Sequence, residues 1–168
     1  MIRVVPVDTD ELRAAMNAIR MTVFVNEQGV DPLAEIDARD QDPRTLHVVA
    51  LDDDGTALGT ARLLPPHHAG EPAHIGRVAV EAAARGRGVG ALLMTALEAS
   101  ALERYGVDGR VSVELSAQEQ ALGFYARLGY VARPERYLDE AIWHRDAVKV
   151  ITGTDTADDA PEGVGPAT

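Results

Sequence analysis

A run of arginines and glycines, Arg85-Gly86-Arg87-Gly88-Val89-Gly90, has the residue types and spacing to bind an anion. It follows an apolar run at residues 75–80 and precedes a helix-like segment at residues 91–105. A helix that begins here presents backbone N–H groups without internal partners, and its dipole favours negative charge at that end. Glycines let a ligand approach closely, and arginines add bidentate donors for phosphate. The sequence therefore predicts a site for a phosphorylated ligand.

Two common nucleotide motifs do not fit this run. The P-loop needs a lysine and a hydroxyl residue after its last glycine, but Ala91, Leu92 and Leu93 follow Gly90. The dinucleotide fingerprint G-x-G-x-x-G also fails, because its third glycine comes one residue early when counted from Gly86. Antiparallel hairpin strands, rather than a lone strand opening a βαβ unit, are expected before the turn.

The elements that must position this turn follow from hydrophobic periodicity. Strands are predicted at residues 2–7, 46–51, 57–64, 74–80, 111–116, 130–133 and 144–151. Helices are predicted from a capping box at Asp8 and Glu11 to before Gly29, at residues 89–105, and around residues 121–128. Residues 26–44, 65–72 and 133–143 lack periodicity and are predicted to be irregular, the first with at most a short helical turn.

Composition limits the class of protein. The 168 residues are 46% apolar and suit one domain over residues 1–151, followed by a disordered acidic tail at residues 152–168. A net charge of −11 argues against nucleic-acid binding. The chain has no apolar run of membrane-spanning length and no signal-peptide pattern, so we expect a cytoplasmic protein without a membrane partner. The absence of cysteine excludes disulfides and a thiol nucleophile.

An ordered set of motifs resembles the GCN5-related N-acetyltransferase (GNAT) family. The set comprises R-x-x-G-x-G at Arg85, Gly88 and Gly90, the V-A-V of residues 78–80, and F-Y-A-R-L-G-Y at residues 124–130. Three further pieces resemble the ElaA-like branch: V-F-V-N-E-Q-G at residues 23–29, I-G-R-V at residues 75–78, and I-W-H at residues 142–144. The resemblance covers about residues 1–151. It implies an α/β (α+β) fold with a mixed, mostly antiparallel sheet, splayed around an acetyl-CoA cleft and covered by helices on both faces.

The same resemblance assigns the residues that hold acetyl-CoA, the acetyl donor. Val78, Ala79 and Val80 would bind the thioester and the pantetheine arm. The main chain of the glycine turn would wrap the pyrophosphate, through Arg85, Gly86, Arg87, Gly88, Val89, Gly90 and Ala91. The alternative is an ordinary strand end followed by a turn with solvated arginines.

The catalytic assignments begin with Tyr125, which matches the tyrosine that protonates the departing thiolate and also contacts the cofactor. Packing beside Phe124 is the alternative role. His74 matches a position where some members place a base that acts through water, and an exposed structural histidine is the alternative. Glu114 is a second candidate base, or a solvated carboxylate. His67, His68 and His74 cluster without carboxylate or cysteine spacing, so no metal site is predicted.

The acceptor is expected to be an amine, on a small molecule or a peptide, that attacks the thioester directly without a covalent enzyme intermediate. For Arg77, Glu27, Glu35 and Asp37 a surface role is the preferred interpretation, and lining the acceptor pocket is the alternative. Trp143 is predicted in the core beside a structural His144, with substrate contact as the alternative. A non-catalytic acyl-CoA-binding or sensor domain and an enzyme using longer acyl groups remain open, as does the choice between monomer and homodimer.

Overall fold

A seven-stranded, mostly antiparallel sheet organises the computed structural model, which describes residues 1–153. The strand order is β1-β2-β3-β4-β5-β7-β6. The strands are β1 (Arg3–Pro6), β2 (Leu46–Leu51), β3 (Ala57–Leu64), β4 (Ala73–Val80), β5 (Arg110–Gln118), β6 (Val131–Asp139) and β7 (Ile142–Thr152). The predicted tail lies, from residue 154 on, outside the described residues.

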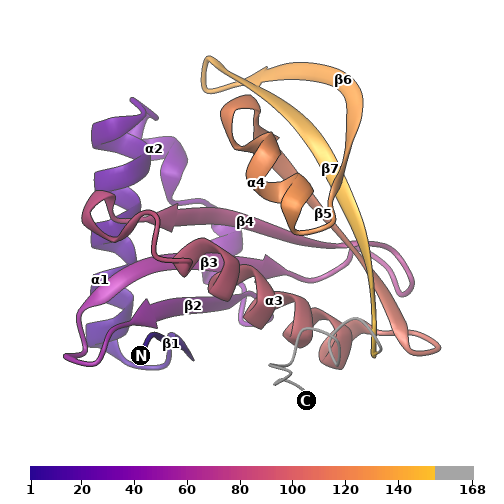
Figure 1. The fold of residues 1–168 in the computed structure, drawn as a ribbon, viewed down its shortest axis with the longest axis horizontal. Coiled ribbons are helices and arrows are strands. Elements are labelled where there is room, and N and C mark those ends of the chain that lie inside the picture. The colour runs from indigo at the N-terminus through magenta and orange to yellow at the C-terminus, as the bar shows by residue number, and fades with distance from the viewer. Residues whose placement is uncertain (154–168) are drawn as a thin grey trace.

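The sheet splits between β4 and β5. These two strands run parallel and pair only at Ala73 with Val113 and at His74 with Glu114. Beyond that point they diverge, so that one arm carries β1 to β4 and the other carries β5 to β7 (Figure 1). The splayed, mixed and mostly antiparallel sheet predicted from the sequence is therefore confirmed. The split leaves one edge of β4 without a neighbouring strand.

Helices cover both faces of the sheet (Figure 1). Helix α1 (Asp10–Arg20) packs Met16 against Val49 and Leu51 on one face of β2, and α3 (Val89–Tyr105) packs on the alternate residues Val48 and Ala50. The short helix α4 (Leu122–Arg127) lies on the α3 face of the second arm. No helix of the described residues is long and apolar enough to cross a membrane.

The N-cap of α1 differs from the sequence prediction by one residue. Thr9, not Asp8, is the cap, and its hydroxyl accepts the backbone N–H of Leu12 at 3.1 Å. Either side chain suits a cap chemically, so the sequence alone did not separate them. Helix α1 then continues as the π-helix η1 (Met21–Glu27), which ends before Gly29 as predicted.

Two segments predicted to be irregular contain regular structure. Residues 26–44 hold α2 (Pro32–Glu35) and the 3₁₀ helix η2 (Ala38–Gln41), which are fixed by the side-chain caps of Asp31 and Asp37. Caps of this kind leave no hydrophobic period. Residues 133–143 belong largely to the β6–β7 hairpin. Because β6 is an edge strand that is exposed along most of its length, it shows no in–out alternation.

Candidate active site

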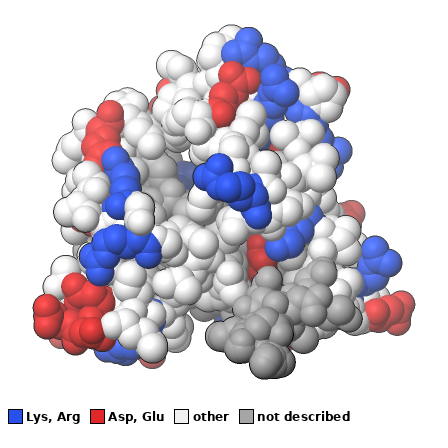
Figure 2. Space-filling view, in the orientation of Figure 1, with Lys and Arg blue, Asp and Glu red and all other residues white. Residues whose placement is uncertain are grey.

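A cavity of about 1370 Å³ occupies the gap where β4 and β5 diverge. Its walls come from both arms of the sheet, from the glycine turn before α3, and from η1 and α4. The hollow is visible in space-filling view between the α1 side of the molecule and the side that carries α4 and β6 (Figure 2). This volume exceeds the roughly 300–1,000 Å³ of most small-molecule pockets, so it can hold a long ligand and a second molecule.

The glycine turn forms one end of the cavity. Gly86 and Gly88 have φ angles of 82° and 78°, in the left-handed region that glycine adopts without strain. The turn and the first residues of α3 leave the backbone N–H groups of residues 86–91 without a backbone acceptor in the described chain. Open space surrounds both glycines, since an added Cβ would meet nothing within 4 Å. A row of free N–H groups at a helix N-terminus suits a pyrophosphate.

The second feature is a bulge in β4. Thr60 pairs with Ala79 and Arg62 pairs with Gly76, so Arg77 and Val78 have no pairing partner on β3. Arg77 has a φ of 53°, which re-aims the strand at this point. The bulge lies on the part of β4 that has lost β5 as a neighbour. Backbone groups around Val78 to Val80 therefore face the cavity, whose wall they form.

Tyr125 lies on α4 with its ring in the main core and its hydroxyl in contact with the cavity. The residue is 9% exposed, and its ring packs edge-on against those of Phe124 and Tyr130. No group of the described chain forms a hydrogen bond with its hydroxyl. That oxygen is not one of the fully buried atoms without a partner, so it is accessible from the cavity that Tyr125 lines. Burial raises the pKa of Tyr125 to about 12, so the hydroxyl keeps its proton near neutral pH. The two roles considered from the sequence, packing and proton donation, are compatible in this arrangement.

The structure places the two predicted bases at the point where β4 and β5 separate. His74 lines the cavity, and its Nδ1 lies 3.9 Å from Oε1 of Glu114. Glu114 itself is not found among the described residues that line the cavity, and Arg133 donates to its Oε2 at 2.9 Å. The geometry thus brings His74, but not Glu114, into contact with the space where a reaction would occur.

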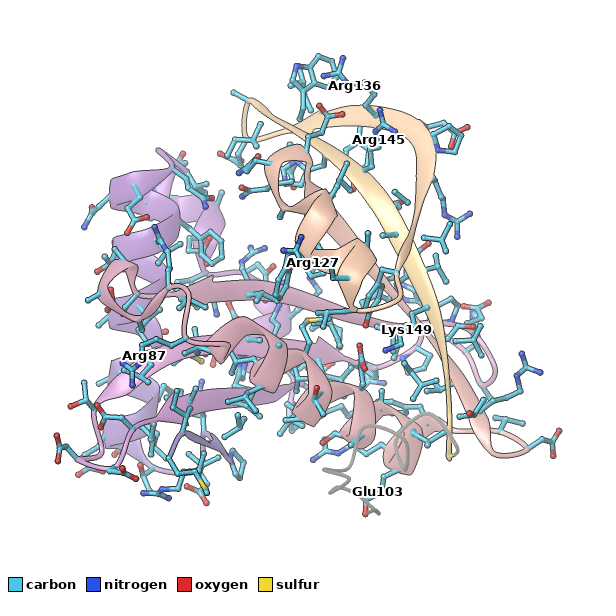
Figure 3. The ribbon with its side chains drawn as sticks, viewed as in Figure 1. Arg87, Glu103, Arg127, Arg136, Arg145 and Lys149 are labelled. Atoms are coloured by element: carbon cyan, nitrogen blue, oxygen red, sulfur yellow. The ribbon has the colours of Figure 1, made fainter. Side chains whose placement is uncertain are left out.

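The arginines around the turn differ in their partners. Arg85 donates to the carboxylate of Glu27 at 2.6 Å and to the carbonyl of Val80 at 3.1 Å, so its side chain ties the turn to η1 and to the end of β4. Arg87 and Arg127 are exposed, on either side of the start of α3 (Figure 3). Arg127 lines the cavity, whereas Arg87 is absent from the described lining. Sequence reasoning missed Arg127, although its place two residues after Tyr125 could have suggested it.

Beside the bulge lies a buried network of charges. Arg20 is 1% exposed and donates to Glu35 at 2.8 Å and to Asp40 at 2.8 and 3.0 Å. Arg62, 2% exposed, donates to Asp40 at 2.8 Å and to Asp37 at 2.8 and 3.0 Å. Three elements, α1, β3 and the segment of α2 and η2, are thereby joined in the wall of the site.

Arg77 extends this network to the bulge. Its Nε lies 3.1 Å from Oε2 of Glu35, and its guanidinium also donates to the carbonyl of Glu35. Burial alone would raise the pKa of Asp40, but hydrogen bonds from Arg20 and from the backbone of Asp37 outweigh it and lower that pKa to about 2. The carboxylate of Asp40 therefore stays charged and paired near neutral pH. Arg77, Glu27, Glu35 and Asp37 all line the cavity, and each is also held by an ion pair.

The opposite wall is formed by β5, β6 and β7. Ser116 and Gln118 point away from the core, as do Tyr137 and His144, and all four line the cavity. Gln118 donates to the side chain of Gln28 at 2.7 Å, which bridges the two arms across the cleft. The prediction of a core tryptophan is wrong, because Trp143 is 43% exposed under the guanidinium of Arg136. Trp143 lies near the turn of the β6–β7 hairpin, where its partner Leu138 is also exposed.

The structure thus combines a splayed mixed sheet, a glycine turn with free N–H groups at the N-terminus of α3, and a tyrosine hydroxyl in the cleft. The model of the acetyltransferase (GNAT) family matches residues 13–130, and the chain belongs to this family. The resemblance to this family that the sequence motifs indicated is therefore confirmed.

Relatives cover most of the chain. A UPF0039 protein of Mycobacterium bovis is 33% identical over 75% of this chain and 76% of its own length. An acyl-CoA N-acyltransferase of Pseudomonas aeruginosa is 36% identical with a TM-score of 0.74, covering 89% of this chain and 98% of that one. Escherichia coli ElaA is 28% identical with a TM-score of 0.76, covering 89% and 99%. Family and neighbours support acyl transfer as the general activity.

Proposed function

We propose that the protein transfers an acetyl group from acetyl-CoA to a primary amine, by direct attack of the amine on the thioester. The observation that carries this proposal is one cavity that joins the free N–H groups of residues 86 and 88–91 to the unbonded hydroxyl of Tyr125. The N–H groups suit the pyrophosphate, and the hydroxyl suits a leaving thiolate.

Each group in the cavity wall would have a separate role in binding or catalysis. The bulged backbone near Val78 would polarise the thioester carbonyl, and the free edge of β4 through Val80 would hold the pantetheine arm. Arg127 would add a charge beside the phosphates from α4. The protonated hydroxyl of Tyr125 would donate to the thiolate as the C–S bond breaks. Preorganised donors of this kind supply much of the rate of such reactions.

The first test measures ligand binding by thermal shift, with acetyl-CoA, CoA, ATP and NADH at matched concentrations. A ligand at about 100 times its dissociation constant adds roughly 2.7 kcal/mol of stability. We expect acetyl-CoA and CoA to raise Tm, and Gly88→Trp to lose that rise because it fills the turn. Gly55→Trp is the matched control, since Gly55 also has a positive φ and open space but lies in the β2–β3 hairpin. A response to ATP or NADH alone would contradict the proposal.

The second test measures turnover as release of free thiol, with spermidine, kanamycin and a lysine-containing peptide as amines. Turnover with an amine supports the proposed activity. Binding of acetyl-CoA without turnover on any amine would instead support a non-catalytic acyl-CoA-binding domain. Faster reaction of a longer acyl-CoA than of acetyl-CoA would support the third possibility, an enzyme with a larger acyl donor.

A further inference from the structure

His144 on β7 has a fixed tautomer. Its Nδ1 lies 2.7 Å from the carbonyl oxygen of Ile142. A carbonyl oxygen only accepts hydrogen bonds, so Nδ1 carries the proton and donates it. In the neutral ring the lone pair is then on Nε2.

The lone pair of Nε2 is accessible from the cavity. The residue is only 8% exposed and lines the cavity wall. Nε2 of His144 has no hydrogen-bond partner in the described chain. The fully buried side-chain atoms without a partner there are Nε2 of His47 and Nε of Arg62, so Nε2 of His144 is not fully buried. The two histidines therefore differ: Nε2 of His47 is sealed inside the protein, and Nε2 of His144 reaches open space.

The ring of His144 is held in place by its neighbours. The ring of Tyr137 stacks on it at 5.9 Å with an interplanar angle of 18°. Tyr137 is itself fixed, since its hydroxyl donates to Asp146 at 2.6 Å and contacts Ser116. On this face of β5, β6 and β7 the titratable neighbours of His144 include Tyr137, Asp139, Asp146 and Glu114, with Glu140 in the hairpin turn. The rest of the cavity wall adds further charged and titratable groups, among them Glu27, Glu35, Asp37, His74, Arg77, Arg85 and Tyr125.

His144 and Tyr125 reach the cavity from opposite faces of the sheet. Ala147 of β7 is in the main core with Tyr125, and His144, three residues earlier, points to the other face. Gln118, the partner of His144 on β5, points the same way. A thioester between β4 and β5 would thus have Tyr125 on one side and His144 on the other.

We propose that Nε2 of His144 accepts a proton from the attacking amine, directly or through one water. This inference rests on the proposed function. A primary ammonium gives its first proton to Nε2, which passes it to solvent, and the neutral nitrogen then attacks the carbonyl carbon. The C–N bond forms, the C–S bond breaks, and the thiolate takes the proton of Tyr125. The second proton of the nitrogen returns to the tyrosinate, so the products are an amide, free CoA and one proton.

His74, the base considered from the sequence, lacks this arrangement. Its ring forms no hydrogen bond with the described residues that would fix its tautomer, and its side chain is 33% exposed. Its nearest ring neighbour is His67, at 6.2 Å. We therefore expect His74 to contribute less than His144 to removal of the proton.

The test uses His144→Asn, because the amide nitrogen of asparagine can replace Nδ1–H while Nε2 is lost. With the best amine of the turnover panel at about pH 7, we expect kcat/KM to fall about 100-fold or more, with an unchanged thermal shift by acetyl-CoA. The loss should shrink as pH rises, because the amine then deprotonates in solution. Hydroxylamine, already neutral at about pH 7, should react equally with both proteins. The control is His68→Asn, an exposed histidine outside the described cavity lining.

The outcomes separate the two proposals. Full turnover of His144→Asn, or a loss in His74→Asn alone, would overturn the role of His144 and leave the acetyltransferase proposal intact. No turnover by the wild-type protein with any amine would remove both. If His144→Asn does not fold, ¹⁵N-histidine NMR of the wild-type protein decides the tautomer. A proton on Nε2 rather than on Nδ1 would overturn the assignment.

Discussion

At the scale of single residues, Tyr125 combines a buried ring with a hydroxyl that forms no hydrogen bond within the described chain. Because burial raises its pKa to about 12, this hydroxyl stays a donor throughout the neutral and mildly alkaline range. Tyr125→Phe removes the donor and keeps the packing. We expect kcat to fall about 10²- to 10⁴-fold with unchanged binding of acetyl-CoA, measured by thiol release and thermal shift.

Tyr105→Phe is the matched control, because Tyr105 ends α3 and lies outside the described lining of the main cavity. It should leave kcat unchanged. Undiminished turnover in Tyr125→Phe would contradict the assignment of the acid. A loss of acetyl-CoA binding equal to the loss of turnover would instead indicate that Tyr125 holds the ligand.

The motif and the helix period both predicted that Tyr125 lies on a short helix, and the structure has it on α4. His144 is different, since its chemistry depends on a bond to the carbonyl of Ile142 and on the ring of Tyr137, a residue of another strand. No pattern of residue types encodes a tautomer. Trp143 was predicted in the core, but it lies near the turn of the hairpin that ends the sheet and is exposed there.

At the scale of elements, the segment of α2 and η2 is fastened to the sheet through charges rather than through a hydrophobic face. Arg20→Met leaves Glu35 and Asp40 buried without this cation, and we expect a loss of about 3–5 kcal/mol in the free energy of unfolding. Arg39→Met is the control. Arg39 pairs with Asp37 of the same network, but its side chain is 62% exposed, so we expect a loss of about 0–1 kcal/mol in the free energy of unfolding. Urea unfolding measures both, and equal losses would contradict the argument.

These buried ion pairs explain why residues 26–44 show no hydrophobic period and were predicted as irregular. Their order depends on Arg20, Arg62 and Arg77, which come from three other elements. By contrast, the strand, turn and helix of residues 74–105 follow from local signals, and the structure has them where they were predicted. Elements held by their own period can be predicted from sequence, and elements held by distant partners cannot.

At the scale of the whole molecule, the sequence predicted the splayed sheet only through a family resemblance. Hydrophobic period identifies β4 and β5 as strands, but not that their pairing stops after His74 and Glu114. Beyond that point the structure has the bulge at Arg77 on β4 and the bridge from Gln118 to Gln28 across the gap, and neither follows from hydrophobic period. The cavity is therefore a consequence of the complete fold.

Acid should destabilise the complete domain in two pH ranges. Burial lowers the pKa of His47, so the folded protein keeps this ring neutral while the unfolded chain binds a proton below about pH 6.5. The unfolded state then holds more protons, and stability falls as pH drops through that range. The lowered pKa of Asp40, about 2 against roughly 3.9 when unfolded, adds a second loss between about pH 4 and 2.

Urea midpoints at about pH 7, 5 and 3 test this expectation. The midpoint should decrease at each step, and His47→Gln should show a smaller decrease between about pH 7 and 5 than the wild-type protein, because glutamine does not titrate. His68→Gln should show the same decrease as the wild-type protein, since the side chain of His68 is exposed. A wild-type midpoint that stays constant from about pH 7 to 5 would mean that His47 binds its proton equally in both states. The buried position of Nε2 of His47 argues against that result, because this atom has no hydrogen-bond partner in the described chain. Burial lowers the pKa of His47 by more than the nearby carboxylate of Asp40, at 3.8 Å, raises it.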